Sequence, residues 1–418
     1  VTVAFVCFVS VVLYLGVPKI LAKMLDARAD GIRAELEEAK SLRDEAKALL
    51  ASYEKKQTEV QAQADRILEA ARVEAAAAAE QAKADIIKFQ TFNTDLCISK
   101  NVEKASYQKK STGHEETQYE MVKKLELSYS DYIEIRDYSE QQGIEFMSTA
   151  FDLPSLDFLS NELNVSLLKI PSGDVLNGPL LLNAAKTRKK IILSTGMCSL
   201  GDIEMALGVL AFGYVNDDKI QPTIESFKSS YYSEIGRKFL KDNVTLLHCT
   251  TEYPAPYNEL NLKVMKTLRI AFDLNVGLSD HSEGITVPIG AVAMGAKVIE
   301  KHFTIDRKME GPDHKASLNP TELKKMVKAI REIDESLGET IKVPRNSELK
   351  NMIIAKKTLV AARDIKKDTV LQGSDIAFKR AGGGIDPIYY WDMIGSKALK
   401  DYKIDEVIVN RIHEKNQL

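Results

Sequence analysis

The sequence lacks several features that mark common classes of protein. Its four cysteines (Cys7, Cys97, Cys198 and Cys249) show no CxxC spacing, which argues against a disulfide framework and a structural zinc site and fits a reducing compartment. Positive charge is not in excess, since 57 Lys and Arg stand against 60 Asp and Glu. No basic stretch is interleaved with aromatic residues, so we expect no nucleic-acid partner.

Charge is also absent from the first 17 residues, VTVAFVCFVSVVLYLGV. As a helix this run would reach about 25 Å, which is marginal for a bilayer core of about 30 Å. The basic residues Lys19, Lys23 and Arg28 follow it, as on the cytoplasmic side of a membrane. We therefore expect a membrane-span-like segment at 1–18, with membrane anchoring through 1–17 and a cytoplasmic catalytic part. The alternative is a buried Val-rich strand or core helix.

Residues 19–85 contain one glycine, Gly31, and no proline. They are rich in Ala, Glu, Lys, Arg, Leu and Gln, the strongest helix formers, and predict a stalk helix on the order of 100 Å long. Apolar residues recur along it at three- and four-residue spacing: Ile32, Leu36, Ala39, Leu42, Ala46, Leu49, Leu50 and Tyr53. Such a narrow stripe favours pairing with another helix, whereas a solvated linker helix is the alternative.

The stretch LDARADGIRAELEEAKSLRDEAKALLASYEKKQ, after the short apolar span, resembles subunit b of bacterial F-type ATP synthase. The resemblance covers residues 1 to about 84 and implies the membrane and stalk portion of that subunit. The distal portion that would bind the soluble motor has no counterpart in the sequence.

After Asp85 the pattern changes to alternating strands and helices, which is typical of a parallel sheet with crossover helices. Seven short apolar runs are predicted to be strands: 86–92, 144–151, 165–173, 190–197, 244–250, 275–281 and 297–304. We expect an α/β fold, a TIM barrel over 86–340, with a Rossmann-like open sheet as the alternative. No GxGxxG follows any strand, which weakens that alternative. The polar stretch from Tyr214 to Asn243 is predicted to be a loop insertion.

Reactive side chains lie at the carboxyl ends of these runs, which share one face in a barrel. They are Lys88 and Gln90, Ser148 and Thr149, Lys169 and Ser172, Ser194 and Thr195, His248 and Thr250, Ser279, Asp280 and His281, and Lys301 and His302. Singly, each is more easily explained as a helix cap or a solvated side chain. Their recurrence in register predicts an active site.

The residue types suggest the chemistry. Lys88, Lys169 and the helix-opening turn at 194–196 favour a small phosphorylated anion. His281 and His302 end consecutive strands, so both imidazoles could reach one ion, for which Mn²⁺ is more natural than zinc. The alternative is a pair of hydrogen-bonded core histidines. Asp313 follows the last strand and could hold a substrate hydroxyl, while the loop from Tyr253 to Tyr257 could form a pocket wall.

The motifs KFQTF, FMSTAFD, LLKIPSGD, ILSTGM, LLHCTTEYPAPY, VGLSDHSEGI, VIEKHFT and GPDHKASLNP follow one another in this order. Together they are similar to the N-acetylneuraminate (sialic acid) synthase family, which includes legionaminate and pseudaminate synthases. The resemblance implies condensation of phosphoenolpyruvate with an N-acetylated hexosamine, N-acetylmannosamine or a 2,4-diacetamido sugar, to a nine-carbon 2-keto acid with release of phosphate. It also implies a divalent metal, Mn²⁺ before Mg²⁺ or Co²⁺, that polarises the sugar aldehyde.

The resemblance assigns roles by position in these motifs. Lys169, Asp174, His281 and His302 are the expected catalytic residues, and the two histidines are the expected metal ligands. The expected substrate-binding residues are Lys88, Gln90, Ser172, Ser194, Tyr253, Ser279, Asp313 and Arg380.

Residues 345–418 have short apolar pieces separated by Gly and Asp turns, which predicts a small β domain. The segment is similar to the antifreeze-like (SAF) domain of these synthases. The resemblance implies a homodimer in which this domain reaches the partner's barrel and places an arginine over its sugar site. Arg380, in KRAGGG, corresponds to that arginine by position in the motif, although the Pro and Asn of the family motif are replaced.

Two departures from the family pattern bear on activity. The family's first barrel strand, which carries a catalytic glutamate, is missing, because the stalk helix leads directly into the strand at Ile86. Asp174 replaces a second glutamate and is one methylene shorter. A barrel without its first strand leaves two unpaired edges, so we expect weak or no activity. The alternatives are a membrane stalk protein that carries a barrel as cargo and an inactive fusion of two truncated genes.

Overall fold

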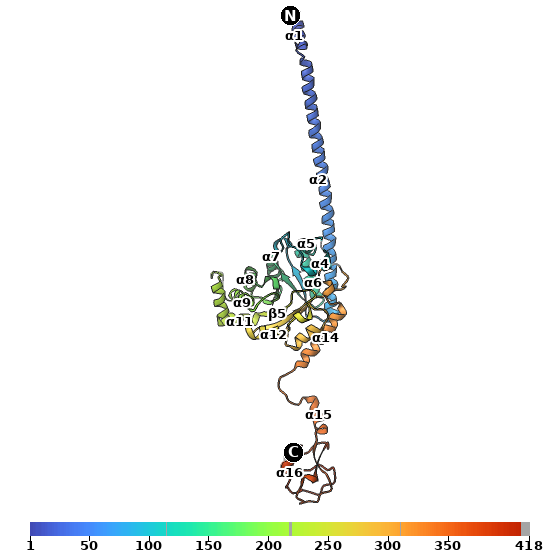
Figure 1. Cartoon of the computed structure of the whole chain (residues 1–418), viewed down its shortest axis with the longest axis vertical. Helices are drawn as coiled ribbons and strands as arrows, with labels where there is room; N and C mark the ends of the chain where they lie inside the picture. The colour runs from blue at the N-terminus through green and yellow to red at the C-terminus, as the bar shows by residue number, and fades with distance from the viewer. Residues whose placement is uncertain (114, 217–219, 310, 411–418) are drawn as a thin grey trace. The chain divides into compact units, whose positions relative to one another are not determined.

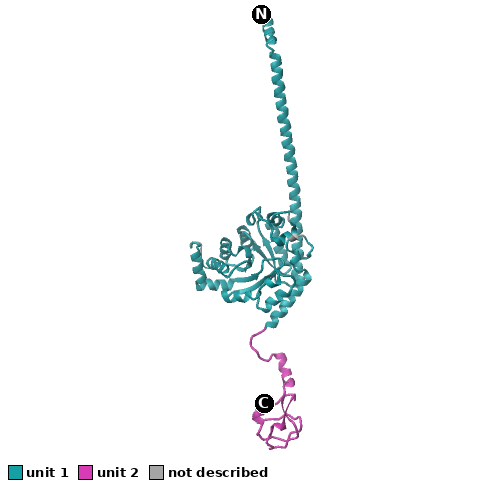
Figure 2. Cartoon of the chain, viewed as in Figure 1, with its two compact units in different colours: residues 1–337 teal, residues 338–418 magenta. Residues whose placement is uncertain are grey.

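The computed structural model describes residues 1–113, 115–216, 220–309 and 311–410. Two compact units make up the chain, Val1–Leu337 and Gly338–Leu418 (Figure 2). The first contains the amino-terminal helices and the strand-helix domain, and the second is a small β domain.

Two helices open the chain. Helix α1 (Thr2–Tyr14) ends before Gly16, which adopts a left-handed φ of 68°, and Pro18 lies in the first turn of helix α2 (Val17–Ala76). Glycine adopts this conformation without strain, and proline at a first helical turn needs no N–H partner. Within the described residues, neither helix alone is long and apolar enough to cross a membrane. The bent pair, with 53° between its helices, passes that test by length and composition.

Helix α2 is the predicted stalk, and its 60 residues are one continuous helix (Figure 1). Its apolar stripe is exposed along the chain, from Ile32 to Val60. The stripe therefore contributes nothing to the core of unit 1.

The last turns of this helix, in contrast, pack on the strand-helix domain. Helix α2 continues into a π-helical turn, η1 (Ala77–Ala82), and Ala75, Ala78 and Ala82 are buried in one apolar cluster. That cluster includes Ile87, which follows on the first strand, and Leu323 of helix α14 (Pro320–Leu337). Alanine allows the close approach of these helices, so the stalk and the domain share one core.

Seven parallel strands form one sheet in the order of the sequence, and each lies within a predicted apolar run. They are β1 (Ile86–Thr91), β2 (Glu145–Ala150), β3 (Leu167–Ile170), β4 (Lys190–Ser194), β5 (Val244–Cys249), β6 (Asn275–Asp280) and β7 (Ile299–Lys301). Among the described strands, β1 pairs only with β2, and β7 only with β6. The sheet is a partial TIM barrel that is open between β1 and β7, as the missing first strand predicts.

Helices connect the strands and cover the outside of the sheet (Figure 1). They include α3 (Thr94–Cys97), α4 (Ser106–Thr112), α5 (Gln118–Lys123), α6 (Tyr129–Gln141), α7 (Leu153–Asp157), α8 (Gly178–Lys186), α9 (Leu200–Val215), α12 (Val264–Phe272) and α13 (Thr286–Ala293). Side-chain caps such as Ser128 and Ser199 satisfy the first N–H groups of α6 and α9. The buried aliphatic faces of these helices and the sheet form the main core.

The segment predicted as a loop insertion is helical instead. Helices α10 (Ile224–Tyr232) and α11 (Glu234–Asn243) precede β5. Phe227 packs edge-on against Phe212 of α9, and Phe239 stacks on Tyr214. The polar composition of the segment did not indicate these aromatic contacts, which hold one face of each helix against α9.

Unit 2 has its own small core. Helix α15 (Asn346–Ala355) precedes two antiparallel strands, β8 (Thr358–Ala361) and β9 (Ile376–Lys379), and helix α16 (Tyr390–Met393) follows. Leu359, Ile376 and Tyr402 are buried together. The irregular β module agrees with the sequence-based expectation.

Candidate active site

Three charged side chains from distant parts of the sequence meet at the carboxyl ends of the strands. Lys88 lies on β1, Lys169 on β3 and Glu300 on β7. The Nζ atoms of the two lysines lie 3.7 Å and 3.6 Å from the same oxygen, Oε2 of Glu300. The carboxylate therefore bridges two cations across the open barrel.

Hydroxyl groups complete this cluster. Lys169 donates a hydrogen bond of 2.8 Å to Ser194 Oγ, and Ser279 Oγ donates one of 2.7 Å to Glu300 Oε1. Burial raises the pKa of Glu300, but Lys88, Lys169 and the Ser279 hydroxyl outweigh it and hold the pKa well below its usual range. Burial lowers the pKa of Lys169. The cluster carries two potential cations for one carboxylate, so a bound anion would balance its charge.

An unsatisfied hydroxyl faces the same region. Thr149 of β2 is the register partner of Lys169, and its buried Oγ1 has no hydrogen-bond partner among the described residues. Buried polar atoms are normally paired, so an unpaired hydroxyl at a cationic site favours an oxygen-bearing ligand.

The turn after β4 is tightly packed at Gly196. Gly196 donates its N–H to Ser172 Oγ at 2.9 Å, and a Cβ at Gly196 would lie 2.4 Å from Thr251 Oγ1. Glycine is thus required for this packing.

The two predicted metal-ligand histidines lie side by side. Their ring centroids are 5.4 Å apart and their planes are nearly perpendicular, at 79°. Nδ1 of His281 donates to the carbonyl of Thr250 at 2.7 Å, which leaves the Nε2 lone pair facing the Tyr253 hydroxyl at 3.2 Å. Tyr253 stacks on His281 with its centroid 4.1 Å away.

Their environment favours the neutral form of both imidazoles. Burial lowers the pKa of His281, and burial with the nearby charge of Lys88 lowers the pKa of His302 to about 3. Oδ2 of Asp313 lies 3.7 Å from Nδ1 of His302, and burial raises the pKa of Asp313. Neutral imidazole is the form that binds metal ions.

The histidine pair fits a divalent cation, but the protein supplies only part of a coordination shell. Within the described ranges no group of three or more His, Cys, Asp or Glu side chains is spaced to hold a metal ion. Two neutral imidazoles beside hydroxyl and carboxyl oxygens suit a hexacoordinate ion whose other positions are open to water or substrate.

Two predicted site residues of unit 1, Asp174 and Gln90, have no side-chain hydrogen bond or ion pair with this cluster among the described residues. Nδ2 of Asn177 donates a hydrogen bond of 2.9 Å to Oδ1 of Asp174, and burial raises the pKa of the Asp174 carboxyl. Gln90 is exposed on β1, where its carbonyl accepts a hydrogen bond from Tyr132. Arg380 follows β9 in unit 2 and is exposed.

Glu300 was not among the predicted site residues, and strand alternation could have found it. Residues two apart on a strand share a face, so Glu300 points inward with His302. Lys301 lies between them and points away, where it forms a buried ion pair with Asp280. His248 likewise faces away from the cluster, and its Nε2 contacts the carbonyl of Leu260 at 2.6 Å.

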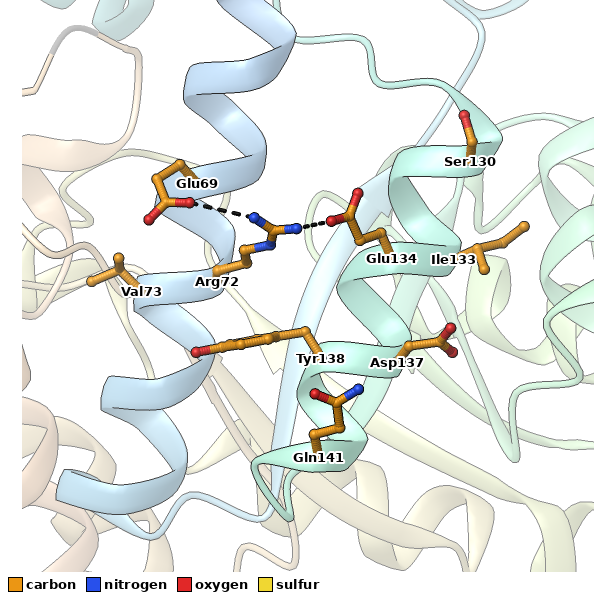
Figure 3. A pocket seen from close by; sticks show the side chains of 9 residues that line it. All are labelled: Glu69, Arg72, Val73, Ser130, Ile133, Glu134, Asp137, Tyr138 and Gln141. Atoms are coloured by element: carbon orange, nitrogen blue, oxygen red, sulfur yellow. Dashed lines mark ion pairs between the residues drawn. The ribbon is translucent and has the colours of Figure 1, made fainter.

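A separate surface pocket lies between helices α2 and α6 (Figure 3). Arg72 forms ion pairs there with Glu69 on its own helix and with Glu134 on α6. None of the residues that line this pocket belongs to the lysine and histidine cluster, so it is a contact zone of the stalk.

The fold and the cluster define a (β/α)-barrel domain with a cationic site at the carboxyl ends of its strands. Residues 74–342 match the model of the NeuB family, and residues 356–410 match that of the SAF domain. The chain belongs to the NeuB family. Residues 1–88 match the model of ATP synthase B/B' CF(0), which supports the resemblance of the stalk to subunit b.

Similar proteins cover most of this chain. An N,N'-diacetyllegionaminic acid synthase from Campylobacter jejuni is 47% identical over 78% of this chain and 90% of its own length. The enzyme of the same name from Legionella pneumophila is 42% identical, over 77% and 83%. A crystal structure of N-acetylneuraminic acid synthetase from Leptospira borgpetersenii, in complex with citrate, superposes with a TM-score of 0.54 and 31% identity, over 70% and 87%.

Proposed function

We propose that this chain is a sialic-acid-type synthase that condenses phosphoenolpyruvate with an N-acetylated amino sugar. The observation that carries the proposal is the Lys88, Lys169 and Glu300 cluster with the neighbouring histidine pair. Two lysines suit the phosphate and carboxylate of phosphoenolpyruvate. A 2,4-diacetamido sugar is the favoured acceptor, because two relatives above 40% identity are named as diacetyllegionaminic acid synthases.

Different groups of residues would bind phosphoenolpyruvate, the metal ion and the sugar. Lys88, Lys169 and the hydroxyls of Thr149, Ser194 and Ser279 would hold phosphoenolpyruvate. His281 and His302 would hold Mn²⁺, which when bound would polarise the sugar aldehyde as a Lewis acid. Tyr253 and Asp313 would contact the sugar. The open edge between β1 and β7 predicts turnover well below that of a closed barrel.

Release of inorganic phosphate tests this function. Purified protein would be given Mn²⁺, phosphoenolpyruvate and either N-acetylmannosamine or a 2,4-diacetamido sugar, with His281→Ala as the control. Sugar-dependent phosphate release that is lost in the variant supports the proposal. No release from folded protein that binds Mn²⁺ would contradict it and favour an inactive fusion.

We also propose that the protein acts as a homodimer in which Arg380 of unit 2 contacts the sugar in the partner's barrel. Its exposure at the end of β9 and the SAF match support this role. Light scattering would give the oligomeric state. Arg380→Ala would raise KM for the sugar and leave KM for phosphoenolpyruvate unchanged, and an equal effect on both would contradict the role.

The match of residues 1–88 to ATP synthase B/B' CF(0) favours a second candidate function, a membrane stalk. The exposed apolar stripe of α2 could pair with another helix, and α1 could insert in a membrane. Fractionation of cells that produce the full chain, compared with a chain that lacks residues 1–17, tests this candidate. Recovery of both chains in the soluble fraction would overturn membrane attachment.

A further inference from the structure

The last two register pairs of β6 and β7, and the residue that follows each strand, alternate between the inside and the outside of the sheet. Ser279 and Glu300 are register partners and meet inside, at 2.7 Å. Asp280 and Lys301 are the next partners and meet outside. His281 and His302 follow and point inside again, with their rings 5.4 Å apart. Asp280 directly precedes His281 in the sequence, and Lys301 directly precedes His302, so each histidine follows one member of the outer pair.

The outer pair is a buried ion pair with additional hydrogen bonds. Lys301 Nζ lies 2.6 Å from Asp280 Oδ2, and the side chains are 2% and 0% exposed. Asp280 Oδ1 accepts hydrogen bonds from the N–H and hydroxyl of Ser282, at 3.0 and 2.8 Å. Lys301 also donates to the carbonyl of Ser282. The pair therefore binds the chain on both sides of His281.

The ion pair of Asp280 and Lys301 lies at the last residues of β6 and β7. Strand β6 stops at Asp280 and β7 at Lys301, so each histidine lies one residue beyond its strand. There the carbonyl of His281 accepts a hydrogen bond from the N–H of Ala255, and that of His302 accepts one from Leu318, both at 2.9 Å. A buried ion pair seldom increases stability over apolar residues of similar size, and its best-supported use is to fix a specific geometry. Side chains that orient the ligands of a metal commonly change metal affinity by 10- to 100-fold when they are replaced.

We propose that Asp280 and Lys301 are positioning residues that clamp the β6 and β7 ends and set the separation and orientation of His281 and His302. The proposal deepens the proposed function, because it rests on the two histidines as the metal site. The pair lies on the outer face of the sheet, so it acts through the backbone of residues 280–282 and 301–302.

The main test is the double variant Asp280→Leu/Lys301→Met, which removes both charges and leaves no unpaired buried ion. Its matched control is Asp242→Leu/Lys238→Met, which makes the same changes in an exposed pair on α11. Three quantities are measured on the full chain: the melting temperature, the Mn²⁺ dissociation constant from the electron paramagnetic resonance signal of free Mn²⁺, and hydrogen exchange of the amides of residues 279–283.

We expect the clamp variant to bind Mn²⁺ at least ten-fold more weakly and to exchange these amides at least ten-fold faster than the control, with a similar melting temperature. Mn²⁺ affinity and exchange within two-fold of the control would overturn the proposal. If the double variant does not fold, Ser282→Ala removes one hydrogen bond of the clamp, and unchanged exchange in that variant would overturn it equally.

Failure of the proposed function has a different signature. A parent chain that neither binds Mn²⁺ nor releases phosphate would contradict the synthase proposal. Hydrogen exchange of the amides of residues 279–283 still tests the positioning role of Asp280 and Lys301 in that case, because the measurement requires no ligand.

Discussion

Ser279 and Glu300 are register partners on β6 and β7, and the serine hydroxyl donates a 2.7 Å hydrogen bond to the carboxylate. The other carboxylate oxygen of Glu300 faces Lys88 and Lys169. Glu300 thus holds the lysines that would bind phosphoenolpyruvate, and it is fixed by a neighbouring strand.

Replacement of Glu300 by glutamine therefore tests the cluster. Glu300→Gln leaves two lysines near each other without a counter-charge, and loss of one partner of a buried ion pair typically costs about 3–5 kcal/mol. We expect a lower melting temperature and phosphate release reduced on the order of 100-fold, the lower end for a group that orients catalytic charges.

The control for this prediction is Glu225→Gln, at an exposed site on α10. Phosphoenolpyruvate supplies negative charge to the same lysines, so it should stabilise Glu300→Gln more than it stabilises the control. Equal stabilisation of the two variants by phosphoenolpyruvate would contradict this prediction.

The buried carboxyl of Glu74 predicts a stability that depends on pH. Its carboxylate lies beside the backbone N–H of Ile305, and burial raises its pKa from 4.5 to about 7. The folded state therefore favours the protonated form. The stability that this preference contributes is fully present below about pH 4.5 and is lost as the pH rises through about 7.

Glu74→Gln should remove this dependence. We expect the variant to exceed the parent in free energy of unfolding at pH 8 by up to about 3 kcal/mol, and to match it near pH 4.5. Urea denaturation at the two pH values measures the difference, with Glu37→Gln on the exposed stalk as control. A gain of equal size at both pH values would rule out Glu74 ionisation as its cause.

Alanines on helix α2 should differ sharply in their tolerance of larger side chains. Ala75 is fully buried, whereas Ala39 is exposed on the same helix. Leucine and alanine both favour helix, so Ala→Leu changes packing more than helix propensity. We expect Ala75→Leu to cost about 1–3 kcal/mol of stability through overpacking, and Ala39→Leu to change it by less than about 0.5 kcal/mol. Thermal unfolding of both variants checks this, and equal effects would contradict a shared core of stalk and domain.

Much of the fold could be predicted from the sequence, because strand periodicity and helix-forming composition are local signals. All seven strands lie in apolar runs, and the long helix follows from strong helix formers with one glycine, Gly31, and no proline after Pro18. Two features could not be predicted in this way. Helices α10 and α11 depend on tertiary anchors such as Phe227, and the helix break at Gly16 depends on one dihedral angle.

The candidate site was predictable in part for the same reason. Lysines and histidines at strand ends were found by position, and the structure brings Lys88, Lys169, His281 and His302 together. Glu300 was not predicted because its role arises from contacts with Lys88 on β1 and Lys169 on β3, which are remote in sequence. Asp174 remains a predicted catalytic residue, although its only side-chain bond among the described residues is to Asn177.

Deletion of the exposed stalk gives a final prediction. Residues before 61 are exposed apart from a few near the break between α1 and α2, whereas Ile67, Leu68 and Ala71 pack on the main core. A chain that lacks residues 1–60 should keep its melting temperature within about 2 °C of the parent, since exposed helix contributes little to a packed core. A chain that lacks residues 1–76 also loses the buried Ala71 and Ala75 and should melt at least about 5 °C lower. Calorimetry of both truncations measures this difference, and a large loss in the shorter deletion would show that the stalk supports the domain.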